Sequence, residues 1–222
     1  MPKLASFHNL HGLNVLLTLG PTREYLDPVR FLTNGSSGKM GLAIAEAMEK
    51  FGAKLFLICG PDVIVPERFA RFEVRSAREM NAAVQDRFSA VDLFISCAAV
   101  SDYRPKKISK IKLHKRRNLW TLSMIQNPDI LAIAGSRKKN QFVVGFALED
   151  ALNLTRARQK MHKKNCDLIV LNDRKTIDSR HINAIFLTPD GGLEKTGLIT
   201  KKRCAELLCQ KISLEIARKI AS

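Results

Sequence analysis

Two nearly continuous apolar runs, DLFISCAAV at 92–100 and QFVVGFAL at 141–148, constrain the fold of this chain most strongly. Runs of this kind are typical of central strands in a parallel sheet, which are buried on both faces. Shorter runs predict further strands at 13–19, 54–60, 119–125 and 166–172. The segment at 182–197 has Pro-Asp-Gly-Gly at its middle and predicts a hairpin.

Helical patterns separate these strands. Apolar residues at helical spacing predict helices from Gly38 or Lys39 to about 51, from the Ser-x-x-Glu capping box at 76–79, from Pro128, from Asp150 to about Lys164, and from about 200 to the end. Alternating strands and helices predict an α/β fold with a doubly wound, mostly parallel, Rossmann-like sheet and a C-terminal hairpin and helix. We predict one domain over residues 1–222. In such sheets, ligands bind at the carboxyl ends of the strands.

The charge of the chain is strongly positive, at +16 from 37 basic and 21 acidic residues. Nucleic acid, small anionic ligands and a generally basic proteome are competing explanations. The segment between Tyr103 and Pro128 has no acidic residue, and its basic residues are Arg104, Lys106, Lys107, Lys110, Lys112, Lys115, Arg116 and Arg117.

The cysteines and the apolar content indicate a compartment. Five cysteines occur without a CxxC pair, so we interpret them as buried free thiols in a reducing compartment and expect no zinc site. No apolar run approaches the roughly 20 residues of a membrane helix, and the first residues lack the apolar core of a secretion signal. We therefore predict a soluble, cytoplasmic protein without a membrane partner.

The loop LTNGSSGKMG at 32–41 has Gly35, Gly38 and Gly41 in a GxxGxxG pattern that leads into a predicted helix. Glycines allow backbone N–H groups to approach phosphate oxygens, and a helix N-terminus adds partial positive charge. Ser36, Ser37 and Lys39 would add hydroxyls and a full charge. An alternative is that the glycines only permit tight packing of the helix.

Two familiar nucleotide motifs do not fit. The glycine spacing differs from the P-loop GxxxxGK[ST], and the second strand ends in Cys59-Gly60-Pro61, where a dinucleotide fold carries an acid for the ribose. Tyr103 and Lys107 have the YxxxK spacing of short-chain dehydrogenases, but Pro105 lies between them and would break a helix. We therefore expect that pair on a loop.

Several segments taken together resemble one family. GPTREYLDPVRFLTNGSSGKMG, AAVSDYRP, KIK, NPDIL, VGFALE and KKNCDLIVLND occur in the order found in phosphopantothenate–cysteine ligase, the cysteine-adding enzyme of coenzyme A biosynthesis. The resemblance runs from about Asn14 to the terminal helix. Many bacteria fuse this domain to a flavin-dependent decarboxylase, and the chain is similar to the stand-alone ligase, so no flavin is implied.

The resemblance implies a two-step reaction assisted by Mg²⁺. The carboxylate of 4′-phosphopantothenate attacks the α-phosphate of CTP or ATP, and cysteine then attacks the acyl-nucleotide. CTP is our choice because the motifs look bacterial. Such a reaction brings like charges together, so its site must supply cations and hydrogen-bond donors. The family is dimeric, which implies a homodimer in which the basic loop and the hairpin cross between subunits.

The resemblance also implies residue roles. Asn34 would act on the acyl-nucleotide through its amide, although it is alternatively a turn residue. Lys110, the first lysine of KIK, would follow phosphate charge through both steps, with Lys107 and Lys112 as alternatives. Nucleotide binding is assigned to Gly20, Ser36, Ser37, Gly38, Lys39, Ala98, Ala99, Asp102, Lys110, Phe146, Lys163 and Lys164.

Substrate binding is assigned to Asn34, Arg30 and Asn172, and Mg²⁺ to Asp102 and Asp129, since hard oxygen ligands suit this ion. Phe146 is alternatively a core residue, and Lys163 and Lys164 alternatively face only solvent. We expect the 34–39 turn, Asp102 and Lys110 to share one cavity. The other function classes are a basic nucleic-acid-binding protein, which the single nearby Trp120 does not favour, and a Rossmann-type NAD(P)-dependent oxidoreductase.

Overall fold

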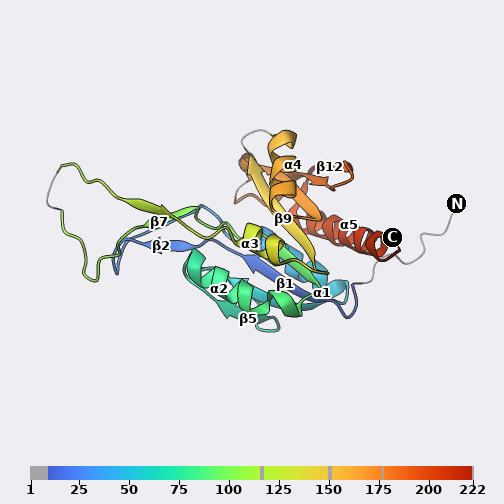
Figure 1. The fold of residues 1–222 in the computed structure, drawn as a ribbon, viewed down its shortest axis with the longest axis horizontal. Coiled ribbons are helices and arrows are strands. Elements are labelled where there is room, and N and C mark those ends of the chain that lie inside the picture. Colours follow the sequence, from blue (N-terminus) through green and yellow to red (C-terminus); the bar gives the residue numbers. More distant parts are fainter. Residues whose placement is uncertain (1–9, 116–117, 150–151, 177, 222) are drawn as a thin grey trace.

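An eight-stranded sheet forms the centre of the molecule (Figure 1). The computed structural model describes residues 10–115, 118–149, 152–176 and 178–221. Along the sheet the strand order is β12-β11-β10-β9-β6-β1-β4-β5. The strands are β1 (Asn14–Leu19), β4 (Lys54–Cys59), β5 (Ala70–Glu73), β6 (Leu93–Ser96), β9 (Phe142–Glu149), β10 (Leu168–Asp173), β11 (His181–Leu187) and β12 (Leu193–Thr200).

The pairing along the sheet is parallel from β5 to β10, and β11 and β12 add antiparallel pairs. From β1 the chain first builds outward through β4 and β5, then returns to build the other half from β6. The carboxyl ends of β1 and β6 therefore flank the point where strand order reverses, which is where open α/β sheets bind ligands.

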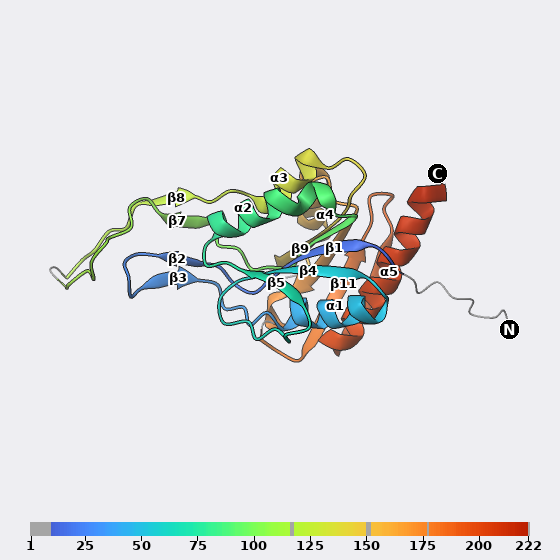
Figure 2. The same ribbon diagram turned by 90° about the horizontal axis from the view of Figure 1, so that it is seen from below.

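Helices cover both faces of the sheet (Figure 2). One face carries α2, α3 and α4, and the other carries α1 and α5. The helices are α1 (Lys39–Lys50), α2 (Ala77–Arg87), α3 (Ile130–Arg137), α4 (Leu154–Lys163) and α5 (Lys201–Ala221). Short 3₁₀ turns lie at η1 (Phe88–Ala90) and η2 (Arg174–Thr176).

Each central strand supplies side chains to two separate cores. In β1, Leu17 packs in the core that includes Ile44 of α1 and Leu208 of α5. The next residue back, Leu16, packs in the core that includes Met80 of α2. Because both faces are buried, the central strands are apolar at most positions, which explains the nearly continuous runs in the sequence.

Two small antiparallel pairs extend from the sheet and lie side by side (Figure 2). One is the hairpin of β2 (Arg23–Tyr25) and β3 (Phe31–Thr33), and the other joins β7 (Tyr103–Pro105) to β8 (Met124–Gln126). The segment between β7 and β8, described at residues 106–115 and 118–123, is called the basic arm below. It projects away from the sheet beyond the hairpin (Figure 1).

The predicted fold class is confirmed, including the C-terminal hairpin and helix. Some predicted boundaries are wrong. The strand at 119–125 is only Met124–Gln126, because it pairs with a three-residue partner and not with the main sheet. The helix after Pro128 begins at Ile130, with Asp129 as N-cap.

The other differences concern segments without an apolar pattern. The predicted helix start at Asp150 lies outside the described residues, and α4 begins at Leu154 with Asn153 as N-cap. The predicted loop at 22–37 contains the β2–β3 hairpin. The edge strand β5 has four exposed residues and was not predicted, since an edge strand needs no apolar run. Among the described helices, none is long and apolar enough to cross a membrane.

Candidate active site

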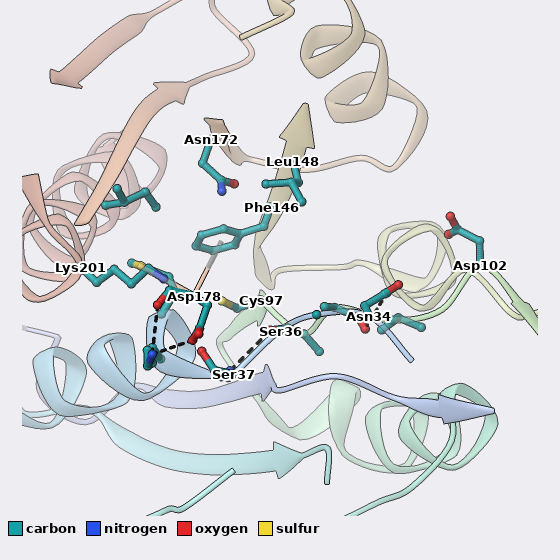
Figure 3. Close-up of a pocket in the computed structure, with 18 of the residues that line it drawn as sticks. Asn34, Ser36, Ser37, Cys97, Asp102, Phe146, Leu148, Asn172, Asp178 and Lys201 are labelled. Atoms are coloured by element: carbon teal, nitrogen blue, oxygen red, sulfur yellow. Dashed lines mark hydrogen bonds and ion pairs between the residues drawn. The ribbon is translucent and has the colours of Figure 1, made fainter. Parts of the chain in front are cut away.

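A cavity of about 480 Å³ opens at the carboxyl ends of β6, β9 and β10 (Figure 3). Its floor is the glycine loop between β3 and α1, and one wall is the segment after β6. Phe146 and Leu148 of β9 and Asn172 of β10 form the opposite wall. The cavity therefore lies beside the point where strand order reverses.

The glycine loop is built to present N–H groups. Gly38 is the N-cap of α1 at φ 73°, a left-handed conformation that glycine adopts without strain. Because Gly38 has no side chain, it offers no acceptor to the first N–H groups of α1, which remain available for an anion. The Ser36 hydroxyl accepts from the Gly38 N–H at 3.5 Å. The loop is thus suited to phosphate oxygens.

Two lysines meet at one end of this cavity. Lys39 Nζ donates to Asp178 Oδ1 at 2.6 Å and to its backbone oxygen at 3.1 Å. Hydrogen bonds from Lys39 and Ser37 lower the pKa of Asp178. Lys201, at the first position of α5, also lines the cavity, and burial and the nearby charge of Lys39 lower its pKa. The Asp178 carboxylate thus lies where cationic groups gather, a position suited to an anion.

Asn34 is oriented by the segment that follows β6. Its Nδ2 donates to the backbone oxygen of Ala99 at 3.1 Å, and Ala99 N–H donates to Gly20 at 2.9 Å. One N–H of the amide is therefore fixed against the wall. The second N–H and the amide oxygen remain for a ligand.

A second cavity of about 340 Å³ adjoins the first and shares Ala98, Val100, Asp102, Phe146 and Lys160 with it. Lys160 Nζ donates to the Phe146 backbone oxygen at 2.5 Å. Burial, followed by the neighbouring charge of Lys164, lowers the pKa of Lys160. A partly buried ammonium group shared by two cavities is a candidate phosphate contact.

Lys164 and Asp129 form an ion pair at the second cavity, with Nζ and Oδ2 2.8 Å apart. The Asp129 carboxylate also caps α3 by accepting from the Ala132 N–H at 3.0 Å. Burial would raise the pKa of Asp129, but the hydrogen bonds from Lys164 and Ala132 lower it. The carboxylate is thus ionised and already partnered at neutral pH.

The structure brings most of the predicted site residues together. The first cavity is lined by Asn34, Ser36, Ser37, Gly38, Lys39, Ala98, Ala99, Asp102, Phe146 and Asn172. The second cavity adds Asp129 and Lys164. The 34–39 turn and Asp102 therefore share a cavity, as expected.

Four predicted residues line neither cavity: Gly20, Arg30, Lys110 and Lys163. Gly20 lies behind the wall, where an added Cβ would approach Val63 Cγ2 to 2.4 Å. Arg30 lies in the β2–β3 turn and pairs with Asp27, and Lys163 is exposed. Lys110 is exposed in the basic arm and lines neither cavity of its own chain.

Sequence reasoning did not select Lys160, Asp178 or Lys201, which line the first cavity. Lys160 has a signal in the sequence, because it lies one helical turn before Lys164 and next to the buried Met161. Asp178 and Lys201 have none, since they reach the cavity from the β10–β11 connection and from the start of α5. Among the described residues, no group of three or more His, Cys, Asp or Glu side chains could hold a metal ion.

The two alternative enzyme motifs fail for physical reasons. A Cβ at Gly60 would lie 1.8 Å from the Pro21 oxygen, so no acidic side chain fits where a dinucleotide fold needs one. Tyr103 begins the short strand β7, and Lys107 follows it in the basic arm, so the pair does not lie on a helix. This confirms the expectation for that pair.

Comparison with known proteins agrees with this geometry. Residues 10–215 match the family described as DNA/pantothenate metabolism flavoprotein C-terminal domain. The coenzyme A biosynthesis bifunctional protein CoaBC of Vibrio parahaemolyticus is 47% identical over 192 residues, which cover 83% of this chain and 48% of that protein. CoaBC of Bacillus subtilis is 46% identical over 168 residues, covering 75% of this chain and 41% of that protein. The chain thus spans about half the length of these relatives.

Solved structures are similar over nearly the whole chain. The crystal structure of the C-terminal domain of CoaBC has a TM-score of 0.81 and 35% identity, covering 94% of this chain and all of that chain. The DNA/pantothenate metabolism flavoprotein from Streptococcus pneumoniae has a TM-score of 0.80 and 26% identity, covering 91% of this chain and 99% of that chain. The resemblance read from the motifs is confirmed: the chain belongs to the DNA/pantothenate metabolism flavoprotein C-terminal domain family.

Proposed function

We propose that this protein ligates cysteine to 4′-phosphopantothenate in coenzyme A biosynthesis, using a nucleoside triphosphate, preferably CTP. The names of its relatives support the pathway. One observation carries the chemistry: a glycine loop suited to phosphate, an oriented amide and a partly buried ammonium group all face a single cavity. Within the described part of the chain, neither the oxidoreductase nor the nucleic-acid-binding alternative has a comparable site.

The proposed reaction has two steps. A carboxylate oxygen of 4′-phosphopantothenate attacks the α-phosphorus of the triphosphate, and pyrophosphate leaves. The amine of cysteine then attacks the acyl carbon, the nucleoside monophosphate leaves and the nitrogen loses a proton as the amide forms. Neither step transfers electrons, so the reaction needs no flavin.

The residues have distinct roles in this proposal. The N–H groups at the start of α1, together with Lys39 and Lys160, offset the charge of the phosphates. Asn34 is held by Ala99, and its second N–H donates to the acyl oxygen as negative charge develops there. Asn172 lies on the opposite wall and binds polar groups of the substrate.

Mg²⁺ fits the carboxylates of this site. The ion is usually bound by one or two carboxylates together with substrate phosphates. Asp102 lines both cavities, and Asp129 lines the second. Because Asp129 is already held by Lys164, Asp102 is the better ligand. When bound, the ion would neutralise charge on the polyphosphate.

Lys110 completes the site, in this proposal, from a second copy of the chain. The basic arm projects away from the sheet (Figure 1), and its Lys110 lines neither cavity of its own chain. The arm also exposes large apolar side chains, including 72% of Ile111 and 81% of Leu119, as expected of a surface that another protein covers. A homodimer would use this surface and bring Lys110 to the partner's cavity.

The first experiment measures pyrophosphate release with CTP, ATP, GTP and UTP, each with 4′-phosphopantothenate and with or without cysteine. We expect release that depends on 4′-phosphopantothenate, before cysteine is added, and is fastest with CTP. Asn34→Asp should retain the first step and lose amide formation. If no triphosphate is consumed, the proposed function is wrong.

The second experiment tests the dimer by mixing two defective variants, Asn34→Asp and Lys110→Gln. In a mixed dimer, one site would combine the intact Asn34 of one chain with the intact Lys110 of the other. Random re-association should therefore restore product formation at about a quarter of the wild-type sites. If Lys110 acts within its own chain, the mixture stays as inactive as its components.

A further inference from the structure

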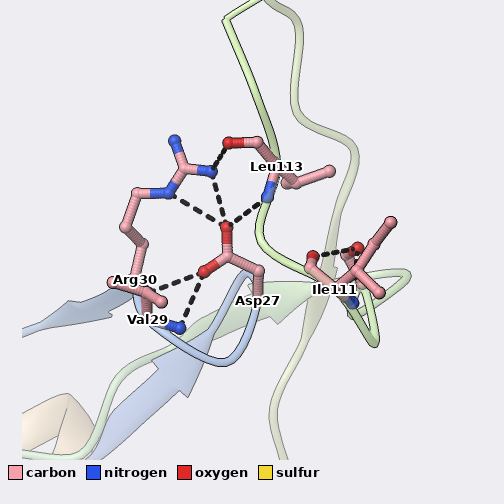
Figure 4. A network of polar contacts seen from close by, with 6 residues as sticks. Asp27, Val29, Arg30, Ile111 and Leu113 are labelled. Carbon is pink, nitrogen blue, oxygen red and sulfur yellow. Dashed lines mark hydrogen bonds and ion pairs between the residues drawn. The ribbon is translucent and has the colours of Figure 1, made fainter.

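Asp27 is fully buried in the turn between β2 and β3, and it joins two segments that are far apart in the chain (Figure 4). Its Oδ1 accepts from the backbone N–H groups of Val29 and Arg30, both at 2.8 Å. Its Oδ2 accepts from the backbone N–H of Leu113 at 3.0 Å and from Arg30 Nη2 at 2.6 Å. One carboxylate oxygen thus closes the hairpin turn, and the other holds the basic arm.

A second contact holds the arm four positions earlier. The backbone N–H of Ser109 donates to the backbone oxygen of Leu26 at 2.9 Å. The contacts at Ser109 and Leu113 bracket the segment 110–112, which contains Lys110 and Lys112. Both lysines are exposed, so this short segment is held at each end while its cations face outward.

Asp27 holds the arm as an anion. Burial alone would raise its pKa, but the hydrogen bonds from Leu113, Arg30 and Val29 outweigh burial and keep the pKa well below its usual range. An asparagine has only one acceptor oxygen. It would keep the turn contacts of Oδ1, as asparagine does in similar turns, and would place an N–H₂ group against the donors of Arg30 and Leu113.

We propose that Asp27 is a positioning residue that fixes the lysine-bearing segment 109–113 of the basic arm for catalysis. The proposal rests on the proposed function, in which a lysine of this segment meets phosphate charge. Asp27 touches no substrate and acts through the arm. A displacement of about 1 Å in a catalytic group lowers turnover by up to about a hundredfold, so a loosened arm should be slow even when the rest of the protein is folded.

The test compares Asp27→Asn with Glu24→Gln in the full chain. Glu24 is a matched control, because it is a buried carboxylate of the same hairpin that accepts from the Ala77 N–H at 2.9 Å and does not contact the arm. We expect Asp27→Asn to lower kcat by about tenfold or more and to change the KM of the nucleotide by less than about twofold. Glu24→Gln should change neither.

Limited digestion with trypsin separates release of the arm from general destabilisation. Trypsin cuts after lysine and arginine, so release of the segment should accelerate cuts after Lys110 and Lys112, as mapped by mass spectrometry. Cuts in the sheet and helices should keep the wild-type rate. Equal acceleration at all sites would mean that Asp27 only stabilises the fold, and the proposal would be overturned.

A double-mutant cycle decides whether Asp27 acts through a lysine. Asp27→Asn is combined with Lys110→Gln in one double variant and with Lys112→Gln in another. If Asp27 acts through one of these lysines, the kcat of at least one double variant should be no more than about twofold below that of its slower single variant. Full additivity with both, or no loss of turnover in either lysine variant, overturns the proposal. Wild-type protein without turnover would refute the proposed function, while the digestion would still test the contact.

Leu113→Pro breaks the same contact from the arm and keeps Asp27 intact, because proline has no backbone N–H. It should reproduce both the loss in kcat and the faster cleavage after Lys110 and Lys112. This variant carries the test if Asp27→Asn does not fold. A folded Leu113→Pro protein with wild-type kcat and wild-type cleavage would overturn the proposal.

Discussion

Gly60→Ala is expected to destabilise the protein through a single contact with Pro21, which pairs with the cavity-lining residue Ala99. Gly60 directly follows β4, and an added Cβ would lie 1.8 Å from the Pro21 oxygen and 2.9 Å from its carbonyl carbon. An ordinary contact between carbon and oxygen is about 3.3 Å. The two backbones must therefore separate by about 1.5 Å.

The separation is difficult because neither atom belongs to a flexible side chain. Gly60 is held by its N–H, which donates to Leu19 at 2.9 Å, and Pro21 forms a parallel bridge with Ala99. Overpacking a core costs about 1–3 kcal/mol and occasionally more. With main chain on both sides, we expect the free energy of unfolding to fall by about 3 kcal/mol. For a domain of this size, that lowers Tm by about 6–12 °C.

Urea unfolding and thermal melts of Gly60→Ala and Gly35→Ala measure this effect. Gly35 is the matched control, because an added Cβ there meets no atom within 4 Å and its φ is not left-handed. Its stability should be unchanged or rise by up to about 1 kcal/mol. A shift of Pro21 would also move its bridge partner Ala99, which accepts the hydrogen bond from Asn34. Gly60→Ala should therefore also lose turnover at temperatures below its Tm. A Gly60→Ala protein within about 1 kcal/mol of the wild type would refute the reasoning.

Two further outcomes follow from the second cavity. Lys160→Met should leave the free energy of unfolding within about 1 kcal/mol of the wild type, because the lost hydrogen bond to Phe146 is offset by removing a partly buried charge. Calorimetric titration should show that this variant binds nucleotide about tenfold more weakly or worse. Asp129→Asn should be less stable than the wild type by under about 1 kcal/mol at neutral pH, since the pair with Lys164 is half-exposed. Because the pKa of Asp129 is lowered, its contribution is present above about pH 4 and is lost as pH falls, so urea unfolding should show this difference shrinking in acid.

Local patterns in the sequence were sufficient for most of the main sheet. The strands buried on both faces give apolar runs, and the capping box at Ser76 is observed, with its hydroxyl accepting from the Glu79 N–H at 3.2 Å. Patterns failed where burial does not decide the structure. β5 is an exposed edge strand, and β2, β3, β7 and β8 are three-residue strands that pair only with one another.

The candidate site was predictable in residue type and only partly in place. Gly38 caps a helix, Asn34 directly follows a strand and Phe146 lies in the second half of β9, on the side of the sheet where a doubly wound fold binds ligands. The contact between Lys39 and Asp178 joins residues 139 positions apart, and no local pattern reports such a distance. Asp178 and Lys201 were missed for this reason.

The direction of the basic arm is also set by contacts between residues far apart in the sequence, and it has a functional consequence. The lysines in the sequence show that this segment carries positive charge, but they do not show which way the segment points from the sheet. That direction is set by the contact between Asp27 and Leu113, which are 86 positions apart, and by the β2–β3 hairpin that lies beside the arm. An arm held outward at both Ser109 and Leu113 cannot fold back to the cavity of its own chain without breaking these contacts and exposing a buried carboxylate. If Lys110 is needed for turnover, the least costly way to bring it to a glycine loop is therefore a second copy of the chain, which the mixed-variant experiment tests directly.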